Sequence, residues 1–476
     1  MSSGSAGVFN RFWSTMGGGE QLASAYALAL ASSFSVELIT TSPFDLELLA
    51  RRLGKPELAH LSVRLIGDSP TAATEISAEY DLFLNHSFTS EDVNLSKFGV
   101  YVCMFPQSFR RPTADDLLRR FNVQAPVSTE VSPFGDSLWI PPLEALQVRA
   151  SNDEVLTFVV DGALGEIDLV DSNGGVIATR VLGAAQREFV TLPVPHGEFT
   201  LVNRSESCTL HILSPRLGDG MRVYIEGGSV NEQGAPAFIK SYDLTLSISQ
   251  FTESFVRERW GISGVVHYPP VSLRPVAPTK ENVILSVGRF FAEDVGHCKQ
   301  QLRMVHAFRR MVDDGLDGWR LSLVGGCDQQ YKDYALEVRR AAHGYPIDVY
   351  LNADLEKLDE EFSRASIYWH ATGLGTDINE HPDRAEHFGI APIEAMSTGA
   401  IPIVFDFGGP REIVSSEDSG FTFDSVHSLI ERTLKVIQLP VNERISLSES
   451  AISRASFFSL DRYLSEFDEI LKRASS

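Results

Sequence analysis

The sequence predicts an α/β protein of two similar halves, with a small all-β unit inserted into the first half. Each half alternates short apolar runs with helical segments, which is typical of a doubly wound, mainly parallel sheet. Residues 146–214 instead form β-rich runs separated by Gly, Asn, Asp or Pro, without a helical period, and indicate a small sandwich. A proline-rich stretch at 267–278 joins the halves as an extended linker, because proline and the residue before it resist helix.

The first half should fold around a glycine-rich turn. A strand ending at Val8-Phe9 leads into the turn at 16–20, and an Ala/Leu-rich helix follows at 21–33. After the β unit, residues 251–261 have the pattern of a helix. The further strands expected in this sheet are 35–40, 61–67, 80–86, 98–105, 221–227 and 242–249.

The second half begins near Asn282 and ends in an amphipathic helix at 456–474. Its expected strands are 283–287, 319–326, 347–351, 366–370 and 401–405. The predicted domains are 1–145 with 215–270, the insertion 146–214, a second α/β domain 271–455, and a terminal helix 456–476 that could return to the first domain.

Charge and composition exclude several classes of protein. Lys and Arg number 41 against 63 Asp and Glu, so the 476 residues carry a formal charge of −22, which argues against a nucleic-acid partner. No apolar run reaches the roughly 18 residues of a membrane span, and the four cysteines form no CxxC pair. We expect a cytoplasmic protein with reduced thiols, and leave contact with the inner membrane face open. The pairs Arg110-Arg111 and Arg119-Arg120 could meet an anionic acceptor or lipid head groups, or form a solvated helix face.

Two glutamates flank the start of a predicted helix in the second half. Pro392 suits its first turn and Gly399 its end, so Glu386 would lie on the preceding loop and Glu394 within the helix. The helix N-terminus would attract a diphosphate. One carboxylate could accept hydrogen bonds from sugar hydroxyls and the other could hold a ribose diol, although a solvated acidic helix start has the same pattern.

This segment, EHFGIAPIE at 386–394 followed by GGPREIV at 408–414, resembles the donor-binding segment of glycosyltransferase family 4. The resemblance implies the GT-B fold of twin Rossmann-like domains, and a retaining transfer of a hexose-type sugar from a nucleotide-diphosphate sugar without a metal or other cofactor. It implies that Glu386 contacts the donor sugar, Glu394 the ribose, and the backbone at 388–390 the diphosphate. The donor-binding residues implied in this segment are His387, Phe388, Gly389, Ile390 and Glu394.

Two cations complete the catalytic set that the resemblance implies. Arg289 follows the first strand of the second half, where the family keeps a phosphate-binding arginine, and a guanidinium can give a diphosphate two parallel bonds. The family's lysine usually comes about five residues later. Here Lys299 comes ten residues later, after the insertion-like run 290–298. Either residue could instead be an ordinary surface cation.

The first half offers a glycine loop and a histidine. Gly17, Gly18 and Gly19 before Glu20 lack the spacing of a dinucleotide site or a P-loop, but resemble the GGGE loop with which the same family approaches donor phosphates. His86 ends a D-x-x-x-x-H strand that also resembles the family, which implies a place beside the reacting carbon; a lone histidine there is more often structural. The hydroxyls at 247–252 match a family segment too, or cap the next helix.

The resemblance implies a front-face reaction, in which the leaving diphosphate helps to accept the acceptor's proton and closure about 268–278 excludes water. The expected partners are a UDP- or GDP-sugar and an acceptor that is a glycan, a lipid-linked molecule or a small molecule. The base should be contacted near 351–355. An epimerase or phosphorylase on the same fold, or a non-catalytic carbohydrate-binding or scaffold protein, remains an alternative. The sugar, the acceptor, the oligomeric state and the role of the insertion stay open.

Overall fold

The chain divides into two compact units. The first comprises 1–247, 254–265 and 474–476, and the second comprises 248–253 and 266–473. The boundary before the second α/β series thus falls at Val265/Val266, ahead of the proline-rich stretch. The computed structural model describes the whole chain except residues 1–3, 16, 68–70, 107–136, 141–144, 151–153, 162–164, 183–186, 195–196, 205–209, 218–220, 223–236, 277–278, 293–297, 379, 415 and 476.

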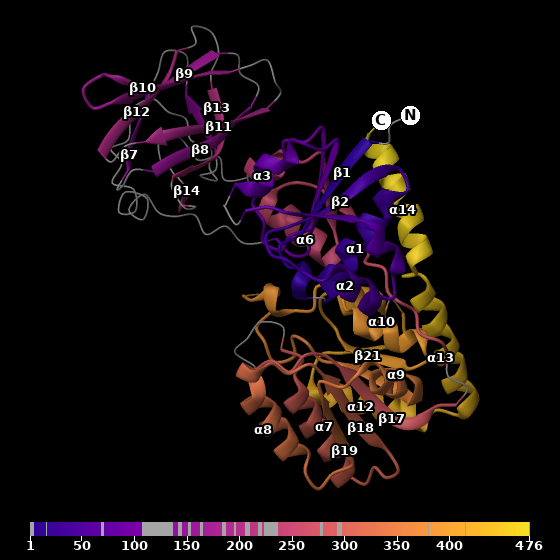
Figure 1. Cartoon of the computed structure of the whole chain (residues 1–476). Helices are drawn as coiled ribbons and strands as arrows, with labels where there is room; N and C mark the ends of the chain where they lie inside the picture. The colour runs from indigo at the N-terminus through magenta and orange to yellow at the C-terminus, as the bar shows by residue number, and fades with distance from the viewer. Residues whose placement is uncertain are drawn as a thin grey trace. The chain divides into compact units, whose positions relative to one another are not determined.

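The first unit is built on a seven-stranded sheet of order β16-β15-β5-β4-β1-β2-β3 (Figure 1). Strand β1 pairs in parallel with β2 on one side and β4 on the other, so the strand order reverses between β1 and β4. In open α/β sheets, ligands bind at such a switch point, beyond the carboxyl ends of the strands. The strands are β1 (Gly4–Phe9), β2 (Phe34–Thr40), β3 (Ser62–Leu65), β4 (Leu82–Asn85), β5 (Phe98–Cys103), β15 (Leu244–Ser247) and β16 (Val265–Val266). The helices are α1 (Gly18–Ala31), α2 (Leu46–Leu53), α3 (Ala72–Ser77), α5 (Ala237–Lys240) and α6 (Gln250–Trp260).

The inserted β unit has two sheets, of order β10-β9-β12-β7 and β11-β8-β13-β14, and β6 also pairs with β13. Phe158 of one sheet and Phe199 of the other are buried in the same apolar core, as expected of a sandwich. The strands run from 137 to 222, which is longer at both ends than the predicted 146–214. They are β6 (Ser137–Ile140), β7 (Ala145–Ala150), β8 (Glu154–Asp161), β9 (Gly165–Asp171), β10 (Val176–Leu182), β11 (Arg187–Val194), β12 (Gly197–Asn203), β13 (Leu210–Leu217) and β14 (Met221–Arg222).

One strand assignment was wrong. Residues 221–227 were expected to resume the first α/β sheet, but Met221–Arg222 pairs antiparallel with β13 of the insertion. The place beside β5 is taken by β15 instead, with Leu244 opposite Val100. Alternating apolar residues predict a strand but do not say which sheet it joins.

The second unit contains a six-stranded sheet of order β19-β18-β17-β20-β21-β22, so the order reverses between β17 and β20. All five predicted strands of this half are present, and a sixth, the short β22, was not predicted. The strands are β17 (Glu281–Val287), β18 (Arg320–Gly325), β19 (Ile347–Leu351), β20 (Ala365–His370), β21 (Ile401–Phe405) and β22 (Phe421–Phe423). The helices are α7 (Gln301–Asp313), α8 (Lys332–Ala342), α9 (Leu355–Arg364), α10 (Ile390–Ser397), α11 (Gly409–Ile413), α12 (Val426–Gln438), α13 (Val441–Ser456) and α14 (Leu460–Ala474), most of them labelled in Figure 1.

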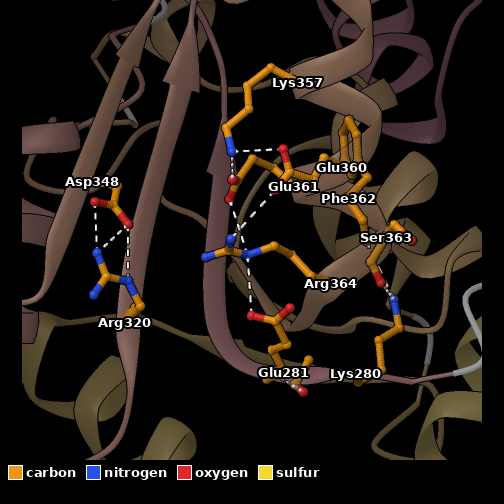
Figure 2. Close-up of polar contacts among 11 residues, drawn as sticks. Lys280, Glu281, Arg320, Asp348, Lys357, Glu360, Glu361, Phe362, Ser363 and Arg364 are labelled. Atoms are coloured by element: carbon orange, nitrogen blue, oxygen red, sulfur yellow. Dashed lines mark hydrogen bonds and ion pairs between the residues drawn. The ribbon is translucent and has the colours of Figure 1, made fainter.

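Charged side chains lie along helix α9 and connect its end to the start of β17. Lys357 contacts Glu360 and the fully buried Glu361, both at 2.8 Å (Figure 2). Arg364 lies between Glu361 and Glu281, within 3.7 Å and 3.6 Å of their carboxylates. Lys280 Nζ donates to the carbonyl of Ser363 at 2.8 Å, which satisfies the end of the helix. Arg364 and Lys280 therefore attach the end of helix α9 to the start of β17.

Candidate functional site

The centre of the candidate site is Glu386, on the loop between β20 and α10. Its Oε2 lies 2.5 Å from Lys299 Nζ and 3.1 Å from His370 Nε2. His370 is the last residue of β20, and Lys299 directly precedes Gln300, the N-cap of α7. The contacts of Lys299 and His370 therefore fall on one oxygen of the carboxylate. The structure brings Lys299 and Glu386 together, although 87 residues separate them.

Opposing effects set the charge of Glu386. Burial raises the pKa of its carboxyl, but the ammonium of Lys299 and the contact with His370 outweigh burial and hold that pKa well below its usual range. Burial also lowers the pKa of His370, more than the nearby carboxylate raises it. At neutral pH the site therefore holds a carboxylate, an ammonium and a neutral imidazole.

The position of Lys299 answers the unusual spacing in the sequence. A Cβ placed on Gly288 would lie 2.7 Å from Cγ of Lys299, so the lysine stem crosses the backbone directly after β17. Gln300, the next residue, has φ +59, which is uncommon outside glycine. Nε of Arg303 donates to Oε1 of Gln300 at 2.9 Å and helps to hold this turn. The ten-residue spacing thus still delivers the ammonium to the end of β17.

Arg289 lies at the same end of the sheet but points to a different partner. Its guanidinium pairs with Asp328, lies 4.9 Å from the ring centre of Phe291, and is 57% exposed. Because the pair is open to solvent, an incoming anion could replace Asp328 at little cost. Asn352 ties the neighbouring loop down, since its Oδ1 accepts from the backbone N–H of Cys327 at 2.9 Å. It belongs to the 351–355 segment expected to contact the base.

The loop before α10 is shaped by close backbone packing. Gly389 has φ +109, which disfavours a side chain, and the helix begins at the next residue, Ile390. A Cβ on Gly409 would lie 2.2 Å from the Cα of Phe388, and the Gly409 N–H donates to the Glu386 carbonyl at 2.9 Å. The two consecutive glycines at 408–409 therefore let the loop carrying Glu386 rest on the start of α11.

The other donor-binding residues predicted in this segment have distinct surroundings. Phe388 is buried and packs against Tyr268 and Phe458, with ring centres 6.0 Å and 5.6 Å away. His387 stacks near Phe251 at 6.2 Å. Phe388 and His387 thus pack through their side chains, and their contact with a donor stays a prediction.

Glu394 lies one turn inside α10 and is paired. Its Oε1 is 3.1 Å from Nη2 of Arg274, and the two side chains are 18% and 16% exposed. Burial raises the pKa of Glu394, and Arg274 opposes that rise. The ion pair occupies Oε1 of Glu394, so a ribose hydroxyl would have to bind at Oε2.

In the first unit, the structure brings the glycine loop and the histidine together at the switch point. A Cβ on Gly19 would lie 3.9 Å from Cε1 of His86. His86 is fully buried, and both of its ring nitrogens lack a hydrogen-bond partner among the described residues. Burial lowers the pKa of His86 to about 3, so the imidazole is neutral. Gly17 and Gly18 are exposed at the start of α1.

Glu20 holds this glycine loop in shape. Its Oε2 accepts from the Gly17 N–H at 2.7 Å and from the Thr15 hydroxyl at 2.6 Å, while Oε1 accepts from Asn10 at 3.2 Å. The carboxylate caps α1 from within its first turn. Farther along, Ser249 caps α6 through a 3.0 Å bond from the Thr252 N–H, which is the capping role considered for that segment.

Sequence reasoning missed a histidine, an arginine and a tyrosine. His370 and Arg274 contact the two glutamates, yet a histidine at a strand end and an arginine in a linker carry no distinctive signal. Tyr368 is fully buried, and its hydroxyl donates to the Val287 carbonyl at 3.2 Å, beneath the same strand ends.

The two predicted arginine pairs at 110–111 and 119–120 lie outside the described residues. Within the described part of the chain, no helix is both long and apolar enough to cross a membrane.

Comparison with known proteins gives both family and fold matches. Residues 274–454 match the family model "Glycosyl transferases group 1". The chain is 26% identical over 246 residues to the "GDP-Man:Man(3)GlcNAc(2)-PP-Dol alpha-1,2-mannosyltransferase" of Xenopus laevis, covering 47% of each protein. It is 32% identical over 162 residues to "Glycogen synthase" of Desulfitobacterium hafniense, covering 32% of each. The match therefore spans about half the length of the mannosyltransferase and about a third of the length of the glycogen synthase.

Solved structures extend the fold match to the whole chain. A glycosyltransferase from Rickettsia africae has a TM-score of 0.55 at 12% identity, over 100% of this chain and 99% of the other. Alr3699/HepE of Anabaena, solved in complex with UDP and glucose, has a TM-score of 0.54 at 11% identity, over 98% of this chain and 99% of the other. The predicted fold class is thereby confirmed. The chain has the GT-B fold of glycosyltransferases, and its second α/β unit is similar to group 1 glycosyl transferases.

Proposed function

We propose that this chain is a glycosyltransferase that moves a hexose-type sugar from a UDP- or GDP-linked donor to a hydroxyl of its acceptor. The observation that carries the proposal is the Glu386 carboxylate, held through one oxygen by Lys299 and His370 at the switch point of the second sheet. A hydrogen-bonding carboxylate, an ammonium and a helix N-terminus at one strand-end edge suit a nucleotide sugar, which presents hydroxyls and a diphosphate together.

In the proposed reaction, the bond between the anomeric carbon and the diphosphate oxygen breaks. The acceptor oxygen forms the new bond to that carbon, and its proton passes to the leaving diphosphate. Arg289 and Lys299 would stabilise the charge that develops on the diphosphate, because charge-assisted bonds are strongest where charge accumulates. Glu386 would orient the donor sugar through its hydroxyls. Retention of the anomeric configuration and independence from a metal belong to this proposal, following the resemblance to family 4.

The names of the relatives support the expected classes of donor and acceptor. The mannosyltransferase relatives carry GDP-mannose and a diphosphate-linked lipid in their names, and the Anabaena structure holds UDP. We therefore propose a UDP- or GDP-sugar donor and an acceptor that is a glycan, a lipid-linked molecule or a small molecule. A cytoplasmic place of work, with contact at the membrane face, is part of the same proposal.

The direct test is a binding titration of the purified protein against UDP, GDP, ADP, CMP and dTDP. We expect one nucleotide to bind selectively, and Arg289→Ala to weaken it by about tenfold, as for one lost charge-assisted contact. Arg320→Ala is the matched control, because Arg320, at the start of β18, is similarly exposed at 48% but pairs with Asp348 of β19. Equal binding by wild type and Arg289→Ala would remove Arg289 from the site, and no binding of any nucleotide would refute the proposed activity.

Transfer itself is tested with Glu386→Gln, once a donor is known. The amide keeps the shape of the side chain but loses the charge that Lys299 neutralises. We expect the rate of product formation to fall by about two orders of magnitude, while the nucleotide alone still binds. Unchanged product formation would rule out the role of Glu386 as written.

A further inference from the structure

Arg274 is fixed by four contacts in the second unit. Its Nη2 lies 3.1 Å from Glu394 Oε1, and its Nη1 pairs with Asp359 of α9. The guanidinium carbon lies 4.4 Å from the ring centre of Phe362, and the backbone N–H donates to Ser397 Oγ at 3.0 Å. The arginine thus joins the linker before β17 to both α9 and α10.

The helix beneath Arg274 has little freedom to move. Lys280 donates to the carbonyls of Phe362 and Ser363 at 3.4 Å and 2.8 Å, and Arg364 lies 3.6 Å from Glu281 of β17 (Figure 2). A guanidinium that stacks on a fixed ring and pairs with two carboxylates is confined in both plane and direction. It can therefore impose an orientation on Glu394.

We propose that Arg274 is a positioning residue for the donor site: it anchors Oε1 of Glu394 and leaves Oε2 to accept from the ribose hydroxyls of the nucleotide. Among the described residues, Oε2 has no hydrogen-bond or ion-pair contact. The inference rests on the proposed function. The inference adds a physical cause for ribose recognition to that function. Because Arg274 already fixes one oxygen of Glu394, the side chain loses less rotational freedom on binding the nucleotide than a free glutamate would.

The rival explanation is that Arg274 only fastens the linker to the second unit. Asp359→Asn separates the two explanations, because it weakens the fastening to α9 without touching Glu394. Asp359 is 53% exposed, so this variant should fold normally. Arg274→Lys is the conservative partner of Arg274→Met, since it keeps the charge but loses the planar, two-sided contact.

The experiment measures dissociation constants of GDP, UDP, 2′-deoxy-GDP and 2′-deoxy-UDP. Wild type should prefer the better ribonucleotide over its deoxy form by about tenfold, the size of one hydrogen bond to a charged group. Arg274→Met should weaken the ribonucleotide by about the same factor and leave the deoxy form unchanged, so that the preference disappears. Asp359→Asn should keep the preference, and Arg274→Lys should restore part of it. In a Glu394→Gln background, Arg274→Met should have no further effect.

The outcomes separate this inference from the function on which it rests. A ribose preference that survives in Arg274→Met, or equal weakening of both nucleotide forms, would overturn the positioning role while leaving the transferase proposal intact. Loss of the preference in Asp359→Asn as well would support simple fastening and would also overturn it. If no ribonucleotide binds the wild type, the proposed function fails and this inference fails with it.

Discussion

Replacing Lys299 with methionine should destabilise the second unit far more than an ordinary surface change. Lys299 and Glu386 are each only 19% exposed, and their charged atoms lie 2.5 Å apart. Removing one member of a buried pair leaves the other charge without its partner and typically costs 3–5 kcal/mol. Because His370 still contacts the carboxylate, we expect about 3 kcal/mol, at the lower end of that range.

Urea unfolding measures this cost, and a double variant tests its cause. Lys299→Met combined with Glu386→Gln removes both charges, so it should recover about 2 kcal/mol of the loss. The control, Arg320→Met, breaks an exposed pair with Asp348 and should cost about 1 kcal/mol or less. The reasoning fails if Lys299→Met costs no more than the control, or if the double variant loses the sum of the two single changes.

The pH dependence of the same variant carries a sign. The pKa of Glu386 is lowered in the folded protein, so its stabilising effect is complete above the unfolded value near 4.5 and fades as the pH falls through the lowered folded pKa. The deficit of Lys299→Met should therefore be largest at neutral pH and shrink in acid. A deficit that grows below pH 4.5 would contradict the assigned charges.

Three further predictions concern other parts of the chain. Burial lowers the pKa of His86 to about 3, so below pH 6.5 the unfolded state binds a proton that the folded state does not bind. The free energy of unfolding should therefore fall by about 1.4 kcal/mol per pH unit toward acid. His86→Gln should flatten that slope when unfolding is measured at pH 7, 6 and 5. Gly409→Ala should displace the backbone of Phe388 and abolish nucleotide binding, whereas Gly326→Ala, whose nearest neighbour would be 3.8 Å away, should fold normally. Glu412→Gln should lower the stability of the second unit by about 1–3 kcal/mol in thermal unfolding, because its carboxylate accepts two backbone N–H bonds at the start of α6, and no loss would show that these bonds are not needed.

The sequence predicted those parts of the structure that depend on local pattern. Helix α10 begins at Ile390 and is followed by Gly399 at φ +94, close to the start and stop that Pro392 and Gly399 indicated. Proline and glycine act through their own backbone, so their effect is readable from neighbours in the chain. The same local signals predicted that Glu386 precedes this helix and that Glu394 lies within it.

Contacts between distant residues could not be predicted in this way. Arg274 and Glu394 are 120 residues apart, and nothing in the linker sequence marks that arginine as a partner. The three-residue strand β22 is too short to show a period, and Met221–Arg222 had the right pattern but joined the other sheet. Pairing of this kind is decided by tertiary packing rather than by the residues alone.

Strands β5 and β15 are immediate neighbours in the first sheet, with Thr245 opposite Tyr101, although the whole β sandwich lies between them in the chain. The sandwich also has an apolar interior of its own, which includes Phe158 and Phe199. None of the described strands of the sandwich pairs with a strand of the first sheet, so the backbone bonds of that sheet do not depend on the inserted segment. Whatever the sandwich does, its stability therefore depends on its own interior and not on strand pairing with the first sheet.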